Sequence, residues 1–392
     1  MKYAYLTRNV WVLSLVSLFT DVASEMLYPV MPLFLRSIGF SMLIIGVLEG
    51  VAEAVAGLSK GYFGRWSDHS ARRLPFVQLG YALSAVAKPM LAVFSWVWWI
   101  FLARMLERLG KGLRTGARDA LLSDEATPAT KGRVFGFHRG MDTLGAVIGP
   151  ALALLYLSMY PEDYRTLFLI AFVPGAIAVF ATFLVRERVR TERPASRFSK
   201  WNFTAFAAYW REGPAAYRRL TGGLLVFALF NSSDVFLLLK AKETGLSDTG
   251  VVGVYIFYNL VYALAAFPMG MLADRLGMRR VLVGGLLLFA AVYAGMGLAS
   301  KGWMIGVLFF LYGIYAAATE GVAKAWISNI SARQDTATAI GTFTAFQSIA
   351  ALAASSLTGF LWYQFGPLVA FSVSAAVAAG VGVYLARVRL QA

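Results

Sequence analysis

Long apolar runs separated by short polar gaps follow one another along almost the whole chain. A helix that crosses a bilayer needs about 20 predominantly apolar residues, and twelve stretches have that length. The first six are predicted at about 9–35, 42–66, 74–95, 97–121, 134–158 and 165–186, and the second six at about 219–240, 249–272, 279–299, 303–329, 336–362 and 367–388. Because several gaps are too short for a domain, the pattern predicts an all-α membrane protein, a compact bundle of twelve transmembrane helices.

The composition supports a protein that lives in a lipid bilayer. Of the 392 residues, 59% are hydrophobic and only 15% are charged, whereas soluble domains carry about 45–50% and about 25%. The chain contains no cysteine, which excludes disulfides, thiolate metal sites and cysteine nucleophiles. Neither a metal nor a cofactor is expected.

The positive charges occupy the gaps between the apolar runs. The net charge is +15, but no basic face stands apart from these gaps, so nucleic-acid binding is not expected. Lys and Arg gather in the gaps after the second, fourth, sixth and eighth spans, while the gap near Lys240 and Lys242 runs against this trend. The positive-inside rule then predicts cytoplasmic N- and C-termini in the cell inner membrane. The first apolar run shows no small-residue cleavage site and is expected to remain as a span.

The long sixth gap divides the chain into two sets of six spans. It predicts an N-terminal bundle at 1–187, a cytoplasmic linker at 188–218 and a C-terminal bundle at 219–392. The linker segment "SKWNFTAFAAYWREG" mixes aromatic and small residues. It is either a plain connection or an interfacial helix lying on the cytoplasmic leaflet.

The two halves are related by an internal repeat. "GRWSDHSARR" begins at Gly64 and "GMLADRLGMRR" begins at Gly270, and at this offset of 206 Asp68 matches Asp274. "IGFS" and "TGLS" match at the same offset farther back. Two parallel repeats of six helices predict a bundle with a pseudo-two-fold axis along the membrane normal.

At these residues the chain resembles the major facilitator superfamily, over essentially its whole length. In that family the loop after the second helix has the form G-x-x-x-D-x-x-G-R-[KR], and the first copy here departs from it at Ala71. The resemblance implies a conformational latch that stabilises the outward-facing state. Its residues would be Gly64, Asp68, Arg72, Arg73, Gly270, Asp274, Arg275 and Arg279. Independently of the resemblance, glycines allow helices to approach closely, and an aspartate can pair with arginine or bind the N–H groups of a helix terminus.

Two further motifs point to branches of this family. "RLGKGLRTG" is similar to the R-x-x-x-G-x-[GA] pattern of proton-coupled members and places Arg108 and Gly112. "GAVIGP" is similar to the G-x-x-x-G-P motif of exporters and places Gly145, Gly149 and Pro150. The glycines permit close packing and the proline can kink the helix.

Ionisable residues inside the spans mark candidate sites, because each costs about 2.5–3.5 kcal/mol at the bilayer centre. Asp21 and Glu25 lie four residues apart, on one helix face. With Asp142 they are the candidate proton sites, because a carboxyl held away from water binds a proton more readily. The candidate substrate contacts are Tyr28, Lys88, Arg104, Arg108, Asn231, Tyr312, Tyr315 and Gln347. A purely structural ion-pairing role stays open for these charges, whereas Arg114, Arg118 and Asp119 are expected to snorkel or pair at the cytoplasmic mouth.

The function predicted is secondary active transport of a small organic molecule, with two halves rocking about a central cavity. A proton-coupled exporter, or antiporter, of a drug or metabolite is favoured. The protein is expected to be a monomer and not to be an enzyme. A proton-coupled importer of an organic anion in the same fold is the alternative. A membrane receptor or a lipid-modifying enzyme is a remote alternative, and no D-D-x-x-D, H-E-x-x-H or P-loop pattern indicates such an enzyme. Cavity bases would suit an anionic cargo and cavity acids a cationic one.

Overall fold

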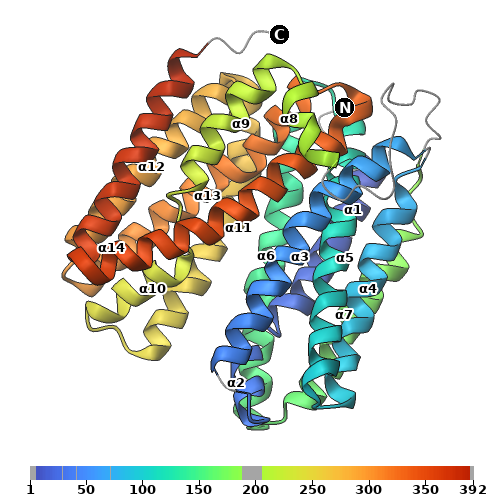
Figure 1. The fold of residues 1–392 in the computed structure, drawn as a ribbon, viewed down its shortest axis with the longest axis vertical. Coiled ribbons are helices and arrows are strands. Elements are labelled where there is room, and N and C mark those ends of the chain that lie inside the picture. The colour runs from blue at the N-terminus through green and yellow to red at the C-terminus, as the bar shows by residue number, and fades with distance from the viewer. Residues whose placement is uncertain (1–5, 29, 41, 71, 188–204, 389–392) are drawn as a thin grey trace. The chain divides into compact units, whose positions relative to one another are not determined.

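The computed structural model describes residues 6–28, 30–40, 42–70, 72–187 and 205–388, and every regular element in these ranges is a helix (Figure 1). The helices that precede the linker are α1 (Arg8–Glu25), α2 (Met31–Ser37), α3 (Met42–His69), α4 (Leu74–Val93), α5 (Val97–Asp124), α6 (Lys131–Met159) and α7 (Tyr164–Thr182). The later ones are η1 (Ala205–Ala208), α8 (Tyr209–Glu212), α9 (Ala215–Ala228), α10 (Asp234–Glu243), α11 (Asp248–Leu276), α12 (Met278–Leu298), α13 (Gly302–Ile330), η2 (Arg333–Asp335) and α14 (Thr336–Arg387). The all-α fold class is confirmed.

Each predicted span corresponds to helical structure, although not always to one straight helix. By length and composition alone, seven helices in the described ranges could cross a membrane, and α14 is one of them. The remaining spans are either interrupted or charged: α1 with α2 and α9 with α10 form the first and seventh, while α3 and α5 carry many polar residues. These are the spans in which the sequence concentrates its chemistry.

The last two predicted spans are joined within α14 at Gly366. This residue has φ 82° and ψ 171° in the middle of the helical stretch. A positive φ is readily adopted by glycine, which has no Cβ to clash with the backbone. Gly366 therefore separates the eleventh span from the twelfth without an intervening loop, close to the boundary predicted at 362–367.

The chain forms two compact units. The first consists of Met1–Glu125, Met141–Glu212 and Ala332–Ala345, and the second of Ala126–Gly140, Gly213–Ser331 and Phe346–Ala392. Each unit thus contains most of one sequence half together with the beginning of one helix, α6 or α14, from the other half. The division of the chain at residues 187 and 219 remains a sequence-based prediction.

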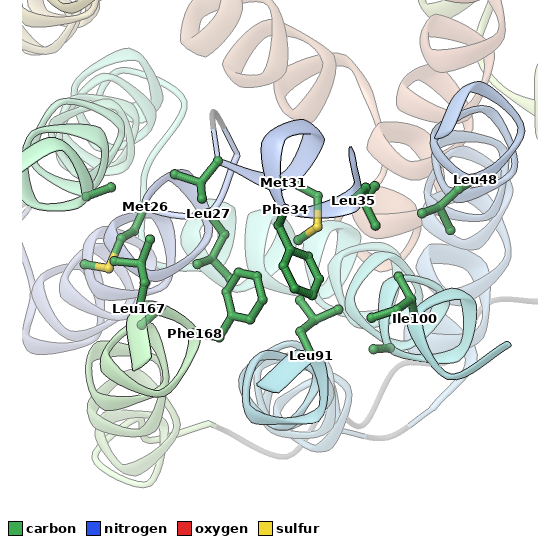
Figure 2. Packing of buried hydrophobic residues seen from close by; sticks show 14 of the residues in the cluster. Met26, Leu27, Met31, Phe34, Leu35, Leu48, Leu91, Ile100, Leu167 and Phe168 are labelled. Carbon is green, nitrogen blue, oxygen red and sulfur yellow. The ribbon is translucent and has the colours of Figure 1, made fainter. Parts of the chain in front are cut away.

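In the first unit the interruption of the first span is packed within an apolar cluster. Residues 26–30 connect α1 to α2, and Met26, Leu27 and Phe34 are almost fully buried there. Figure 2 shows these side chains against Leu91 of α4 and Phe168 of α7. Phe34 meets Phe168 edge to face, with ring centroids 4.8 Å apart. Such close packing holds the interrupted helix in one geometry.

The second unit is built around α13, which packs against both α11 and α12. Rings from several helices meet on its buried side: Phe289 of α12 lies 4.9 Å from both Phe227 of α9 and Tyr315 of α13, between ring centroids. This aromatic core surrounds the polar residues of the seventh span described below.

The described part of the linker lies on the first unit. Trp201 and Phe203 are outside the described residues, but η1 and α8 follow them. Phe206 and Tyr209 are buried, and the backbone carbonyl of Phe206 accepts a hydrogen bond from Thr342 at 3.1 Å. This portion is packed against protein, and α9 begins at Ala215, four residues before the predicted span.

Candidate functional site

Helix α5 carries a row of cations, of which Arg104, Arg114 and Arg118 are buried in the first unit while Lys111 is exposed. Arg104, Arg108, Lys111, Arg114 and Arg118 recur every three or four residues, so they share one helix face. The neighbouring helices α1, α3, α4 and α6 supply carboxyl and hydroxyl groups that meet this row. The first unit therefore contains a connected polar site inside a helical bundle.

Glu107 joins two of the predicted substrate residues. Its carboxylate forms an ion pair with Arg104, one turn earlier on α5, and lies 4.0 Å from the Lys88 ammonium of α4. Lys88 also donates hydrogen bonds to the Ser84 carbonyl at 3.0 Å and to the Ser24 hydroxyl at 3.3 Å. Since Lys88 is only 1% exposed, its charge is compensated entirely by these neighbours in the described structure.

Two of the predicted proton sites lie together where α1 packs on α6. The Asp21 Cβ lies 2.8 Å from the position that a Cβ at Gly145 of α6 would occupy, one turn beyond Asp142, and the Ser17 hydroxyl donates to Asp142 from one turn earlier on α1. Arg118 of α5 donates to Ser17 at 3.1 Å and lies 3.9 Å from Asp142. A carboxyl pair thus stands beside one guanidinium group.

The third predicted proton site, Glu25, lies one turn beyond Asp21 at the end of α1. The cations that influence it most are Lys111 and Arg108 of α5. Arg108 in turn lies 3.7 Å from the Glu53 carboxylate of α3. Glu25 therefore shares its electrostatic environment with the cationic row, although it is not part of the Asp21–Asp142 contact.

The prediction that Arg114, Arg118 and Asp119 snorkel at the cytoplasmic mouth is wrong because all three are buried, whereas the alternative of pairing is found for Arg118 and Asp119. They are 5%, 7% and 1% exposed, and Arg118 pairs with Asp119 at 2.8 Å. Arg114 donates to the Ser84 hydroxyl and lies over the Tyr81 ring. The three-to-four-residue spacing of basic residues along α5 is the sequence signal that would have placed them in the interior.

The glycines predicted to pack helices do so within the first unit. A Cβ at Gly145 would lie 2.6 Å from the Leu18 carbonyl oxygen, and one at Gly149 would lie 2.6 Å from that of Val22, both on α1. At Gly112 a Cβ would lie 2.2 Å from the Ser59 side chain of α3. Pro150 lies inside α6, which continues through it to Met159. The close approach at Gly145 brings Asp21 near Asp142.

In the second unit three predicted substrate residues form a separate group. The Asn231 side-chain amide donates to the Tyr315 hydroxyl at 3.3 Å, and the rings of Tyr315 and Tyr312 lie 5.2 Å apart. The Tyr312 hydroxyl donates to Asp234 at 2.7 Å. Asp234 was not among the predicted site residues.

Two of the predicted substrate contacts are placed apart from these groups. Tyr28, in the interruption between α1 and α2, is 56% exposed. Gln347 of α14 is also exposed and makes no hydrogen bond to any described residue. Their substrate role stays a prediction.

The first latch motif binds the beginning of α14. Asp68, at the end of α3, accepts hydrogen bonds from the Thr338 backbone N–H at 2.6 Å and from its hydroxyl at 2.8 Å. The other oxygen of Asp68 pairs with the fully buried Arg73, which also reaches Asp124 at 2.8 Å. A Cβ at Gly64 would lie 2.5 Å from the Ala337 carbonyl oxygen, so the helices touch there through their backbones.

The second latch motif repeats this arrangement in the other unit. Asp274, near the end of α11, accepts from the backbone N–H groups of Gly132 at 2.8 Å and Arg133 at 3.0 Å, in the first turn of α6. A Cβ at Gly270 would lie 2.1 Å from the Gly132 carbonyl oxygen. Thr338 and Gly132 are themselves 206 residues apart, so the repeat relates both partners of each contact. A carboxylate is favourable at a helix N-terminus, where unpaired N–H groups point outward.

The arginines of the two copies differ more than the aspartates. Arg279, the counterpart of Arg73, donates to the carbonyls of Val388 at 2.6 Å and Ala386 at 3.5 Å, while Arg133 pairs with Asp274 at 3.2 Å. Arg72 and Arg275 are exposed and form no ion pair with the described residues. Gly277 adopts φ 95° between α11 and α12, whereas its counterpart Ala71 lies outside the described residues.

Comparison with known proteins adds four observations. The sequence profile described as Major Facilitator Superfamily matches residues 13–258 and 219–391. The MFS-type transporter MJ1317 of Methanocaldococcus jannaschii is 32% identical over 91% of this chain and 89% of its own length. A multi-drug resistance efflux pump PmrA homolog of Lactococcus lactis is 21% identical over 83% and 81%. The solved structure of the human organic anion transporter MFSD10 superposes with a TM-score of 0.81 at 17% identity, covering 96% of this chain and 99% of that one.

Proposed function

The chain belongs to the major facilitator superfamily, and we propose that it is a proton-coupled exporter that moves a small organic molecule across the cytoplasmic membrane by alternating access. The observation that carries this proposal is that Asp21 and Asp142 lie next to each other where α1 packs on α6, with Arg118 of α5 3.9 Å from Asp142. The distribution of positive charge supports a cytoplasmic location of both termini in this proposal.

The carboxyl pair is suited to hold and release one proton. Two carboxylates in contact repel each other when both are ionised, so a shared proton stabilises the pair. Arg118, now 3.9 Å from Asp142, would favour the ionised form on closer approach. A movement of α5 relative to α1 and α6 would therefore change the affinity for the proton.

The latches provide the two-state element that alternating access requires. Asp68 and Asp274 each bind the first turn of a helix through backbone N–H groups, which are available only while the helix ends remain in place. Release of either contact during transport would let the two helices that it joins separate within their unit. The resemblance to the family implies that the closed latches accompany the outward-facing state.

Export is favoured over import by two observations. The glycine pair Gly145 and Gly149 of the exporter-like motif packs directly against α1, where Asp21 lies. The similarity to an efflux pump homolog over 83% of the chain points in the same direction. A symporter would use the same carboxyl pair, so the direction of proton movement decides between the two.

The test is a flux assay in proteoliposomes that enclose a pH-sensitive dye, with ethidium and tetraphenylphosphonium as transported probes. An exporter of this kind moves protons in the direction opposite to the probe. Asp142→Asn is expected to abolish this coupled proton movement. Glu162→Gln, a surface change in the loop before α7, serves as the matched control and retains coupling. Probe transport without proton movement would contradict the coupling, and movement in the same direction would identify a symporter.

A further inference from the structure

The seventh span is interrupted close to the position that corresponds to the interruption of the first. Helix α9 ends at Ala228 and α10 begins at Asp234, while α1 ends at Glu25 and α2 begins at Met31. At the offset of 206 the two interruptions overlap with a displacement of three residues. Residues 231–233 have no helical structure, and an interrupted span leaves polar groups available to a ligand.

Asp234 lies against a group of tyrosine rings. The Tyr312 hydroxyl donates to its carboxylate at 2.7 Å. The Tyr312 ring centroid lies 5.1 Å from that of Tyr258, 5.2 Å from that of Tyr315 and 6.4 Å from that of Tyr293. These four tyrosines are buried, while Asp234 itself is half-buried. One partly accessible carboxylate therefore lies next to a group of buried tyrosine rings.

This carboxylate has no cationic partner. No lysine, arginine or histidine nitrogen of the described residues lies within 4 Å of Asp234. The other acid of this region, Glu320, forms an ion pair with Arg139, and the buried acids of the first unit each meet an arginine. Among the described residues the negative charge of Asp234 therefore has no compensating cation, and a ligand could neutralise it.

Helix capping does not account for Asp234. The preceding Ser233 accepts the hydrogen bond from the Val235 N–H at 3.4 Å and caps α10. The positive end of the helix favours a carboxylate at its first position without neutralising it. In addition, the buried side-chain oxygen of Asn231 has no hydrogen-bond partner among the described residues, which adds a second acceptor next to the interruption.

We propose that Asp234, with Tyr258, Tyr312 and Asn231, forms a binding site for an organic monocation. The carboxylate would neutralise the cation, and the electron-rich tyrosine faces favour a large, weakly hydrated ammonium or phosphonium group over a hydrated metal ion. A hard metal ion would need six or more oxygen ligands, and the described residues contain no group of three His, Cys, Asp or Glu placed to hold one. The substrate of the proposed exporter would then be an organic monocation, and this assignment rests on the proposed function.

The experiment measures equilibrium binding of radiolabelled tetraphenylphosphonium to purified protein in detergent, without any transport step. Tetraphenylborate, which has the same shape and the opposite charge, serves as the competitor. Asp234→Asn is compared with Glu243→Gln, a neutralisation on the exposed face of the same helix. Tyr312→Phe keeps the ring and Tyr312→Leu removes it, and size-exclusion profiles and melting temperatures confirm that each variant is folded.

The site predicts that Asp234→Asn and Tyr312→Leu weaken binding about tenfold or more, whereas Tyr312→Phe and Glu243→Gln stay within about threefold of the unmodified chain. Tetraphenylborate should not compete. Unchanged affinity in both Asp234→Asn and Tyr312→Leu, or equal competition by tetraphenylborate, would overturn the site. Because binding is measured without a gradient, the two proposals can fail separately. Binding of the cation without proton movement would contradict the proton-coupled exporter and support the site. Proton-coupled flux without this binding would support the exporter and contradict the site.

Discussion

Glu107 is one side chain that compensates two buried cations of the first unit. Its carboxylate compensates both Arg104 and Lys88, which are 5% and 1% exposed. Neither cation reaches bulk water, so the loss of this one acid would leave two charges without their main partner. Breaking a buried ion pair by removing one member is far more costly than its net contribution, because the remaining charge stays desolvated.

Glu107→Gln is therefore expected to destabilise the protein by on the order of 3–5 kcal/mol. The measurement is unfolding of the purified protein in detergent, followed by intrinsic tryptophan fluorescence. Glu162→Gln, which removes an acid from a surface loop, provides the baseline. A melting temperature of the Glu107 variant equal to that baseline would show that the two cations have other compensation.

At the residue scale the sequence could identify the charges but not their partners. The four-residue spacing of Asp21 and Glu25 placed both on one face of α1, and their position within an apolar run marked them as costly. That Asp142 meets Asp21, whereas Glu25 faces the cations of α5, depends on how α6 packs on α1. Helix rotation of this kind is set by tertiary contacts, which the period of one helix does not contain.

At the scale of elements, close packing of α1 on α6 determines where the carboxyl pair forms. Gly149 lies so close to α1 that a Cβ would be 2.6 Å from the Val22 carbonyl oxygen and 2.7 Å from the Met26 nitrogen. Backbone atoms cannot move aside as the end of a flexible side chain can. The exporter-like motif was recognisable from the sequence, but the identity of its partner helix was not.

Gly149→Ala is expected to destabilise the protein by about 1–3 kcal/mol, because even one methyl group overpacks this contact. Gly253→Ala is the matched control, since Gly253 lies in α11 with no atom within 4 Å of its Cβ position. That change should cause no loss, because alanine favours the helix over glycine by about 1 kcal/mol. Equal melting temperatures for the two variants would contradict the packing described for α1 and α6.

The interruptions of the first and seventh spans are the element-scale features that the sequence showed least clearly. Continuous apolar runs predicted one helix at 9–35 and one at 219–240, whereas each of these spans consists of two helices joined by a short turn. Apolar packing around Met26 and Phe34 stabilises the first turn, and the cap by Ser233 begins α10 after the second. These tertiary and local contacts outweigh the hydrophobic continuity.

At the scale of the whole molecule, the repeat is the organising feature. The sequence offset of 206 is reproduced in three dimensions, because Asp68 with Thr338 and Asp274 with Gly132 are equivalent contacts. The charges are not equivalent: the first unit contains the carboxyl pair with its arginine, and the second contains the acid among tyrosines. We infer that proton binding and substrate binding are assigned to different repeats of one framework.

The most direct test of this account is whether protonation of the Asp21–Asp142 pair changes the conformation. Because the chain contains no cysteine, Ala129→Cys and Ala332→Cys, at exposed positions preceding the two latched helices, can be spin-labelled without background. Pulsed electron–electron double resonance then gives the distance between the two spin labels at mildly acidic and mildly alkaline pH. We predict two distance populations whose ratio changes with pH in the otherwise unmodified chain and is independent of pH when Asp21→Asn and Asp142→Asn are added. A ratio that does not change with pH in the otherwise unmodified chain would contradict the account, as would an undiminished pH dependence in the chain that carries Asp21→Asn and Asp142→Asn.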